Sequence, residues 1–213
     1  MMSVPHTISV KCSVCGKSSK QTILLSSNRF GAPDLDLRPP QMMRGTMRWW
    51  IQECPRCGYV AKSLDDKTNV TSKWLQSAEY RACNDIDFSS SLAKRFYRHY
   101  LISEKQRNVN DAFYAALHAA WACDDTGDTE NAVRCRTLAL NELEKMIASG
   151  PSNEDFLVLK ADLLRRTGAF DALIEEYQNK AFSSDLLNRI IAFQIAKAKL
   201  GDTACYTVAD VEE

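Results

Sequence analysis

Two short cysteine pairs are the residues of this chain whose types and spacing point most directly to chemistry. Residues 12–16 read Cys-Ser-Val-Cys-Gly, and residues 54–58 read Cys-Pro-Arg-Cys-Gly. Two residues between the cysteines let both thiolates face one metal ion, and the glycine that follows permits a backbone with positive φ. The pairs together predict one tetrahedral Zn²⁺ site with the ligands Cys12, Cys15, Cys54 and Cys57.

Cysteine pairs of this spacing also occur in redox proteins, and disulfides or an iron centre use the same residue type. A thioredoxin-like pair lies beside a βαβ pattern, and the sequence around these two pairs shows none. We therefore favour zinc over the disulfide, redox and iron alternatives. Since four thiolates fill the coordination sphere, we expect a structural ion rather than hydrolytic chemistry.

The elements that must position these cysteines are short strands. Residues 7–26 are rich in β-formers around the first pair and predict a strand, a turn and a return strand. Residues 46–53 predict a strand that runs into the second pair, with Trp49 and Trp50 on opposite faces. The 38 residues between the pairs exceed the ~15–20 of a compact zinc module, so we expect a loop insertion at about 27–45.

After residue 62 the periodicity becomes helical. We expect helices at 72–83, 90–106, 110–124, 128–148, 154–167, 169–182 and 185–200. Gly127, Gly168 and Gly201 each follow a helical stretch, and the last two are 33 residues apart, close to the ~34-residue tetratricopeptide period. The predicted fold class is α+β, with a small N-terminal β zinc ribbon (1–62) followed by an all-α, tetratricopeptide-like domain (63–213).

The proline-rich loop offers a second group of candidate functional residues, because acids and arginines alternate there. They can bind a partner's charged segment, or they can form internal ion pairs that hold the loop against the helices. An exposed tryptophan beside these arginines is also able to stack on nucleobases. The candidate partner-binding residues are Asp34, Asp36, Arg38, Arg44, Arg48 and Trp50.

The net charge of zero conceals an uneven distribution. Residues 1–62 carry nine Lys/Arg and three Asp/Glu, a charge of +6, and residues 63–213 carry −6. The basic ribbon either attracts nucleic acid or an acidic partner, or packs on the chain's own acidic helices. The sequence shows no apolar run of ~18–20 residues and no signal peptide, so we expect a cytoplasmic protein without membrane association.

Other chemistry-bearing residues receive structural interpretations. Phe113, Tyr114, Leu117 and Trp121 follow a helical spacing and are expected to line the helical core, with His118 beside them. No nucleophile or acid motif accompanies this histidine, so we expect a protein that is not an enzyme. The four isolated cysteines are expected to be small buried residues within helical segments: Cys83, Cys123, Cys135 and Cys205.

The chain resembles the bacterial proteins grouped as domain of unknown function 2225. The likeness lies in the first cysteine pair, in the Cys-Pro-x-Cys-Gly-Tyr segment 54–59 after a Trp-bearing strand, and in the helical C-terminal half. It is most specific between Phe30 and Ala61. The resemblance implies zinc binding by the four paired cysteines and implies no activity.

Taken together, these patterns favour a zinc-binding scaffold or adaptor that binds a protein or peptide partner through its helical repeat surface. The alternative is a nucleic-acid-binding module in which the basic ribbon contacts phosphates and a tryptophan stacks on bases.

Overall fold

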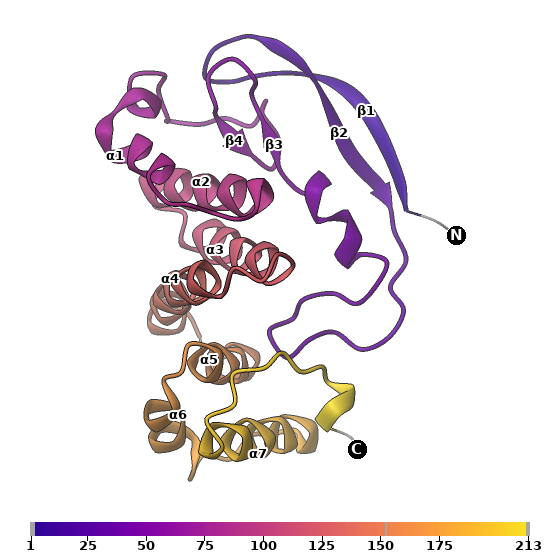
Figure 1. Ribbon diagram of the computed structural model, residues 1–213, viewed down its shortest axis with the longest axis vertical. Helices are drawn as coiled ribbons and strands as arrows, with labels where there is room; N and C mark the ends of the chain where they lie inside the picture. Colours follow the sequence, from indigo (N-terminus) through magenta and orange to yellow (C-terminus); the bar gives the residue numbers. More distant parts are fainter. Residues whose placement is uncertain (1–2, 152, 212–213) are drawn as a thin grey trace.

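The computed structural model describes residues 3–151 and 153–211, and it places short β-strands beside a column of helices (Figure 1). Strand β1 (Val4–Lys11) pairs antiparallel with β2 (Ser18–Ser26). Strand β3 (Gln52–Glu53) pairs antiparallel with β4 (Val60–Ala61). The helices follow in the remaining two thirds of the chain. The predicted α+β class, with the small β part first, is confirmed.

The helical part of the described chain contains seven α-helices that stack one after another in Figure 1. Ser90 and Asp128 cap two of them, because each side chain accepts a hydrogen bond from the backbone amide three residues later. The third predicted helix begins slightly earlier than expected, because Asn108 is its cap. The helices are α1 (Ala78–Arg81), α2 (Ser91–Gln106), α3 (Val109–Asp124), α4 (Thr129–Ser149), α5 (Glu154–Arg166), α6 (Phe170–Tyr177) and α7 (Asp185–Lys199).

Two predicted helices are too long. Residues 72–83 form two 3₁₀ turns around the four-residue α1, because Ser77 has an extended backbone that breaks a continuous helix and caps α1 instead. Helix α6 ends at Tyr177 rather than near residue 182. Beyond it, the Asn188 side chain accepts from the amide of Phe182 and donates to its carbonyl, which fixes a non-helical connection into α7.

The strand predicted at 46–53 is wrong over most of its length, because residues Arg44–Trp49 form a 3₁₀ helix and only β3 is extended. The Thr46 amide donates to the Met43 carbonyl, and the Thr46 hydroxyl accepts from Nε1 of Trp50 at 2.8 Å. Met47 is buried on the inner side of this turn. Trp49 and Trp50 therefore do not lie on opposite faces of a strand.

One hydrophobic core crosses the boundary predicted at residue 62. Val10, Ile51 and Val60 from the β part belong to the same buried cluster as Phe96 of α2 and Leu117 of α3. The strands are therefore packed directly on the helices rather than joined to them by a free linker.

A second core fills the C-terminal end of the molecule. It contains Leu173 of α6 and Ile191 of α7, and it includes Leu35 from the loop that follows β2. Backbone hydrogen bonds run from the Leu35 amide to the Tyr206 carbonyl and from the Val208 amide to the Pro33 carbonyl. The loop thus spans the molecule from the strands to the C-terminal segment, where Figure 1 shows the two in contact.

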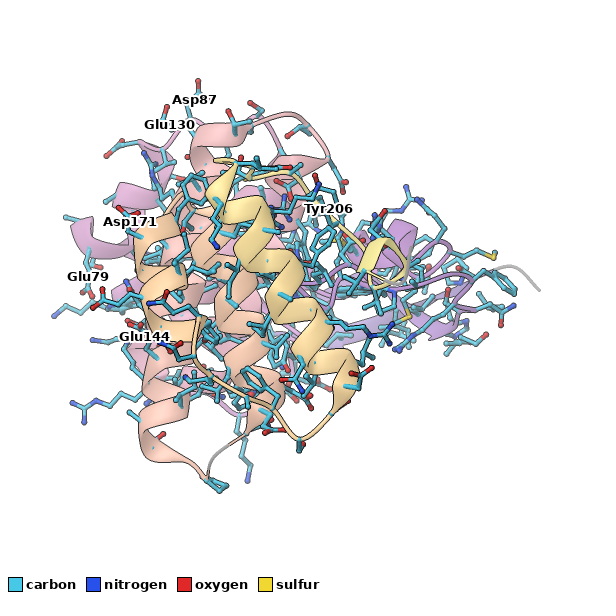
Figure 2. All side chains as sticks on the ribbon, turned by 90° about the horizontal axis from the view of Figure 1, so that it is seen from below. Glu79, Asp87, Glu130, Glu144, Asp171 and Tyr206 are labelled. Atoms are coloured by element: carbon cyan, nitrogen blue, oxygen red, sulfur yellow. The ribbon has the colours of Figure 1, made fainter. Side chains whose placement is uncertain are left out.

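Acidic side chains gather on the side of the helices that faces away from the β part. Figure 2 shows Glu79, Asp87, Glu130, Glu144 and Asp171 along this side, whereas Tyr206 lies nearer to the strands. The charge asymmetry of the sequence is therefore also a spatial one. In the part of the chain that the structure describes, two acids of the helical part form ion pairs with the basic part, Asp125 with Arg38 and Asp111 with Lys62.

Candidate metal centre

Each cysteine pair forms the same tight turn. The Gly16 amide donates to the Cys12 carbonyl at 2.8 Å, and the Gly58 amide donates to the Cys54 carbonyl at 2.9 Å. The two glycines have φ values of +70° and +72°, a conformation that costs a side-chain-bearing residue about 1 kcal/mol or more. The expected role of these glycines is confirmed.

The two turns face each other and bring four thiol groups together. All four Sγ atoms lie within 4.8 Å of one another. The Sγ atoms of Cys12 and Cys57 are 3.8 Å apart, and those of Cys15 and Cys54 are 3.6 Å apart. Sulfurs placed ~2.3 Å from a tetrahedral zinc ion are separated by ~3.8 Å, whereas a disulfide needs ~2.05 Å. The cluster fits one metal ion and does not contain disulfides.

The surroundings of the four thiols differ. Cys12 and Cys54 are buried, and Cys15 and Cys57 are partly exposed. Burial raises the pKa of the Cys12 and Cys57 thiols. Burial acts on Cys15 in the same direction, but the backbone amide of Lys17 and the neighbouring thiols outweigh it and lower its pKa to about 7. Cys15 is therefore more readily deprotonated than Cys12 or Cys57.

The helices hold the second turn in place by ionic and hydrogen-bond contacts. Glu53, just before Cys54, accepts from Arg98 at 2.8 Å and pairs with Arg95 at 3.3 Å, both on α2. The Tyr80 hydroxyl of α1 donates to the Gly58 carbonyl at 3.2 Å. A metal ion at the cysteines would therefore link the β1–β2 hairpin to a turn that is already fixed on the helices.

The isolated cysteines lie apart from this centre. Cys83, Cys123 and Cys135 are buried, as expected. Cys205 is a correction, because it is exposed in the segment after α7 rather than buried in a helix, and its thiol donates to Asp34 at 3.3 Å.

The candidate partner-binding acids of the loop are buried and paired inside the chain. Asp36 accepts from Nε1 of Trp121 at 2.8 Å and from Arg166 at 3.2 Å. Arg38 donates to Asp125 at 2.6 Å, and Asp34 pairs with Arg44. These contacts match the alternative interpretation of the loop, in which internal ion pairs hold it against the helices.

The other two candidate residues of this region have different surroundings. The Arg48 guanidinium lies 4.8 Å from the ring centre of Trp49, and the residue is exposed. Trp50 is partly buried, with its ring 5.1 Å from that of His118 on α3. Trp50 therefore faces α3, whereas Trp49 lies beside the exposed Arg48.

Sequence reasoning missed two hollows of the surface near these tryptophans. Arg48, Trp49, Lys20 and Arg95 contribute to a basic hollow of about 350 Å³. On the other side of the 3₁₀ helix, Trp50 and α3 line a largely apolar pocket of about 310 Å³. The i, i+4, i+7 spacing of Tyr114, His118 and Trp121 places these rings on one face of a helix. This pattern is compatible with the apolar pocket, but it predicts a buried core equally well.

Comparison of the chain with protein-family models, curated proteins and solved structures gave no match. The resemblance to the domain of unknown function 2225 family therefore stays a prediction that rests on the sequence motifs. Among the described residues, no helix combines the length and apolar character needed to cross a membrane.

Proposed function

We propose that this chain is a cytoplasmic zinc-binding adaptor that acts by binding a protein or peptide partner. One Zn²⁺ ion held by Cys12, Cys15, Cys54 and Cys57 fixes the β part on the helices. The observation that carries the metal-binding part of the proposal is the cluster of four Sγ atoms, whose 3.6 and 3.8 Å separations match the edges of a tetrahedral site.

A structural rather than catalytic role follows from the ligand set. Four thiolates leave no coordination position for water or substrate, so the ion would contribute folding energy and no Lewis-acid chemistry. The adaptor role is supported by the rigid loop after β2. It exposes 61 % of Phe30 and 51 % of Leu37, while ion pairs of Asp36 and Arg38, on either side of Leu37, hold it on the helices.

The metal proposal is tested by elemental analysis of protein purified without added metal. We expect one zinc per chain, and loss of the zinc together with a lower Tm in Cys57→Ser. Cys205→Ser is the matched control, since that thiol lies outside the cluster, and it should keep its zinc. Iron, or no metal in a stably folded protein, would contradict the proposal.

The adaptor proposal is tested by isolating the tagged protein from its native lysate and then reconstituting any candidate complex from purified components. We expect one partner that binds at a fixed stoichiometry. If no purified candidate binds the zinc-loaded protein, the adaptor function is wrong.

A second candidate function is supported by the basic hollow around Trp49. The exposed Lys20 and Arg48 lie beside an aromatic ring, an arrangement that suits stacking on a base and contact with phosphates. A fluorescein-labelled oligothymidine is the probe. We expect affinity that falls steeply with salt and that decreases in Trp49→Ala but not in the control Trp74→Ala. Salt-insensitive or absent binding would exclude this candidate.

A further inference from the structure

The apolar pocket between the loop and α3 has walls of two kinds. Aromatic rings of Trp50, Tyr114 and Trp121 form one wall with His118. The opposite wall is formed by residues of the loop: Pro33, Leu37, Pro39 and Pro40. The pocket has a volume of about 310 Å³, which lies at the small end of the range for ligand sites. The pocket is separate from the metal centre.

The aromatic wall is held rigidly before any ligand arrives. The indole Nε1 of Trp50 donates to Thr46, and that of Trp121 donates to Asp36, both at 2.8 Å. The His118 ring packs 5.1 Å from Trp50 and 4.9 Å from Trp121. Because both indole donors already have partners, the wall offers mainly ring surfaces to a ligand, at little cost in ordering.

The loop wall presents an apolar residue in an unfavourable conformation. Leu37 has φ of +67°, which costs a non-glycine residue about 1 kcal/mol or more, and yet 51 % of it is exposed. It is held there by its amide, which donates to the Asp34 carbonyl, and by the buried Asp36 and Arg38 on either side. Leu37 therefore forms an apolar rim of the pocket that a partner would cover.

The one charged residue that lines the pocket favours an anionic group on a partner. Arg29 is an exposed lining residue with no ion pair among the described residues, and no carboxylate lines the pocket. Burial, aided by the nearby His99 and by the charges of Lys62 and Arg38, lowers the pKa of His118 to about 3. The imidazole is therefore neutral at pH 7, and Arg29 is the one charged side chain among the lining residues. A carboxylate at the rim can pair with Arg29.

We propose that this pocket receives one aromatic or large aliphatic side chain from an acidic segment of a partner protein, with a neighbouring carboxylate on Arg29. This inference rests on the adaptor function proposed above and names the chemistry of its partner. A nucleotide fits less well, because its sugar and phosphate would lie on the apolar rim formed by Leu37, with Arg29 as the one charged lining residue to bind them. A buried aromatic anchor is a common centre of protein interfaces.

The test uses the zinc-loaded protein and short synthetic peptides. The probes are acetyl-Glu-Glu-Phe-Glu-Glu-amide, its Leu counterpart, an Ala counterpart, and a Phe peptide with Lys in place of Glu. Binding is followed by the ¹H–¹⁵N signals of the Trp50 and Trp121 indoles, with Trp74 as an internal reference. We expect saturable shifts with the Phe or Leu peptide, and at least about tenfold weaker binding of the Ala and Lys peptides.

Two variants with matched controls place the binding in this pocket. Leu37→Gly removes the apolar side chain at the rim, and glycine adopts the positive φ of this position without strain. The variant should therefore fold normally and bind the Phe peptide about tenfold more weakly. Leu200→Ala removes an exposed leucine elsewhere and should bind like the wild type. Arg29→Glu should lose affinity for the acidic peptides, whereas Lys199→Glu, an exposed charge reversal on α7, should not.

Four results would overturn the proposal. The first is no shift with any peptide up to about 5 mM, and the second is equal binding of the Lys and Glu forms of the Phe peptide. The third is tighter binding of adenosine monophosphate than of the Phe peptide. The fourth is a shift that depends on protein concentration without peptide, which would place a second copy of the chain in the pocket. A reconstituted partner that binds Leu37→Gly as well as wild type would also overturn it, but would leave the adaptor function intact.

Discussion

Nε1 of Trp121 donates a 2.8 Å hydrogen bond to Oδ2 of Asp36, a residue 85 positions earlier in the chain. The same carboxylate accepts from Arg166 of α5 and lies 3.7 Å from Arg136 of α4. Asp36 is 1 % exposed, and both arginines are buried. One loop residue therefore joins three helices, and it also orients an aromatic ring that lines the apolar pocket.

Replacing Asp36 should be strongly destabilising. Asp36→Ala leaves the buried Arg166 and Arg136 with one partner fewer and the Trp121 indole without an acceptor, so we expect a loss of about 3–5 kcal/mol. Urea unfolding followed by circular dichroism measures this loss. Glu130→Ala removes an exposed pair with Arg134 and is the control, with an expected change below about 0.5 kcal/mol. Equal effects of the two changes would mean that the buried network contributes little.

Removing the metal should lower stability. The cysteine cluster links the β1–β2 hairpin to the turn that Glu53 and Tyr80 hold on the helices, and protonated thiols cannot replace that link. We expect a chelator to lower the Tm by about 10–20 °C, corresponding to roughly 5 kcal/mol for a chain of this size. Differential scanning calorimetry with and without chelator measures the shift, and added zinc should reverse it. An unchanged Tm after verified metal loss would contradict a structural role.

Acid should destabilise the protein through two buried histidines. Burial lowers the pKa of His118 to about 3 and that of His99 to about 4, against 6.5 for a free side chain. Below pH 6.5 the unfolded chain therefore binds protons that the folded chain does not. The histidine contribution to stability is complete above about pH 7 and is lost as the pH falls from 6.5 toward 4 and then 3, at up to about 1.4 kcal/mol per pH unit for each histidine.

The variant His118→Phe isolates one of these contributions. Phenylalanine fills a similar space among the rings of Phe96, Trp50 and Trp121 and does not titrate. Urea unfolding between about pH 7 and pH 5 should show a shallower loss of stability for the variant than for the wild type, by up to about 1.4 kcal/mol per pH unit. His6→Gln, on the exposed side of β1, controls for the removal of a histidine. Parallel pH curves for wild type and His118→Phe would refute the assignment.

The sequence predicts those features whose causes are local. The cysteine spacing and the two following glycines determine the turns that carry the four cysteines. Ser90 and Asp128 cap the helices that they were expected to cap. The strand expected at 46–53 is a 3₁₀ helix as far as Trp49, where the Trp50 indole donates to Thr46 and Met47 is buried. Tertiary contacts of this kind routinely override propensity.

Long-range pairing explains the remaining differences. Asp36 follows a local alternation of acids that does not indicate its burial, which depends on Arg136 of α4 and Arg166 of α5. These partners lie about one hundred residues away, so no local pattern indicates them. The apolar pocket has the same origin, because its two walls come from the loop and from α3.

The C-terminal segment should help to hold the loop in place through Tyr206. Its carbonyl accepts from the Leu35 amide at 2.8 Å, and its ring packs 5.2 Å from the Arg165 guanidinium and 5.0 Å from the Phe193 ring. Tyr206→Ala removes the packing that fixes this carbonyl. We expect a stability loss of about 1–3 kcal/mol and faster hydrogen exchange at the Leu35 amide, because local opening no longer requires global unfolding.

Hydrogen exchange measured by NMR gives both quantities in one experiment, with Thr203→Ala as the control for a change at an exposed neighbouring position. Leu37, in the wall of the apolar pocket, lies two residues beyond Leu35. Faster exchange in Tyr206→Ala should therefore be accompanied by weaker binding of the acidic Phe peptide. If Leu35 exchanges at the wild-type rate, the buried contacts of Asp36 hold the loop without help from the C-terminal segment, and peptide binding should be unchanged.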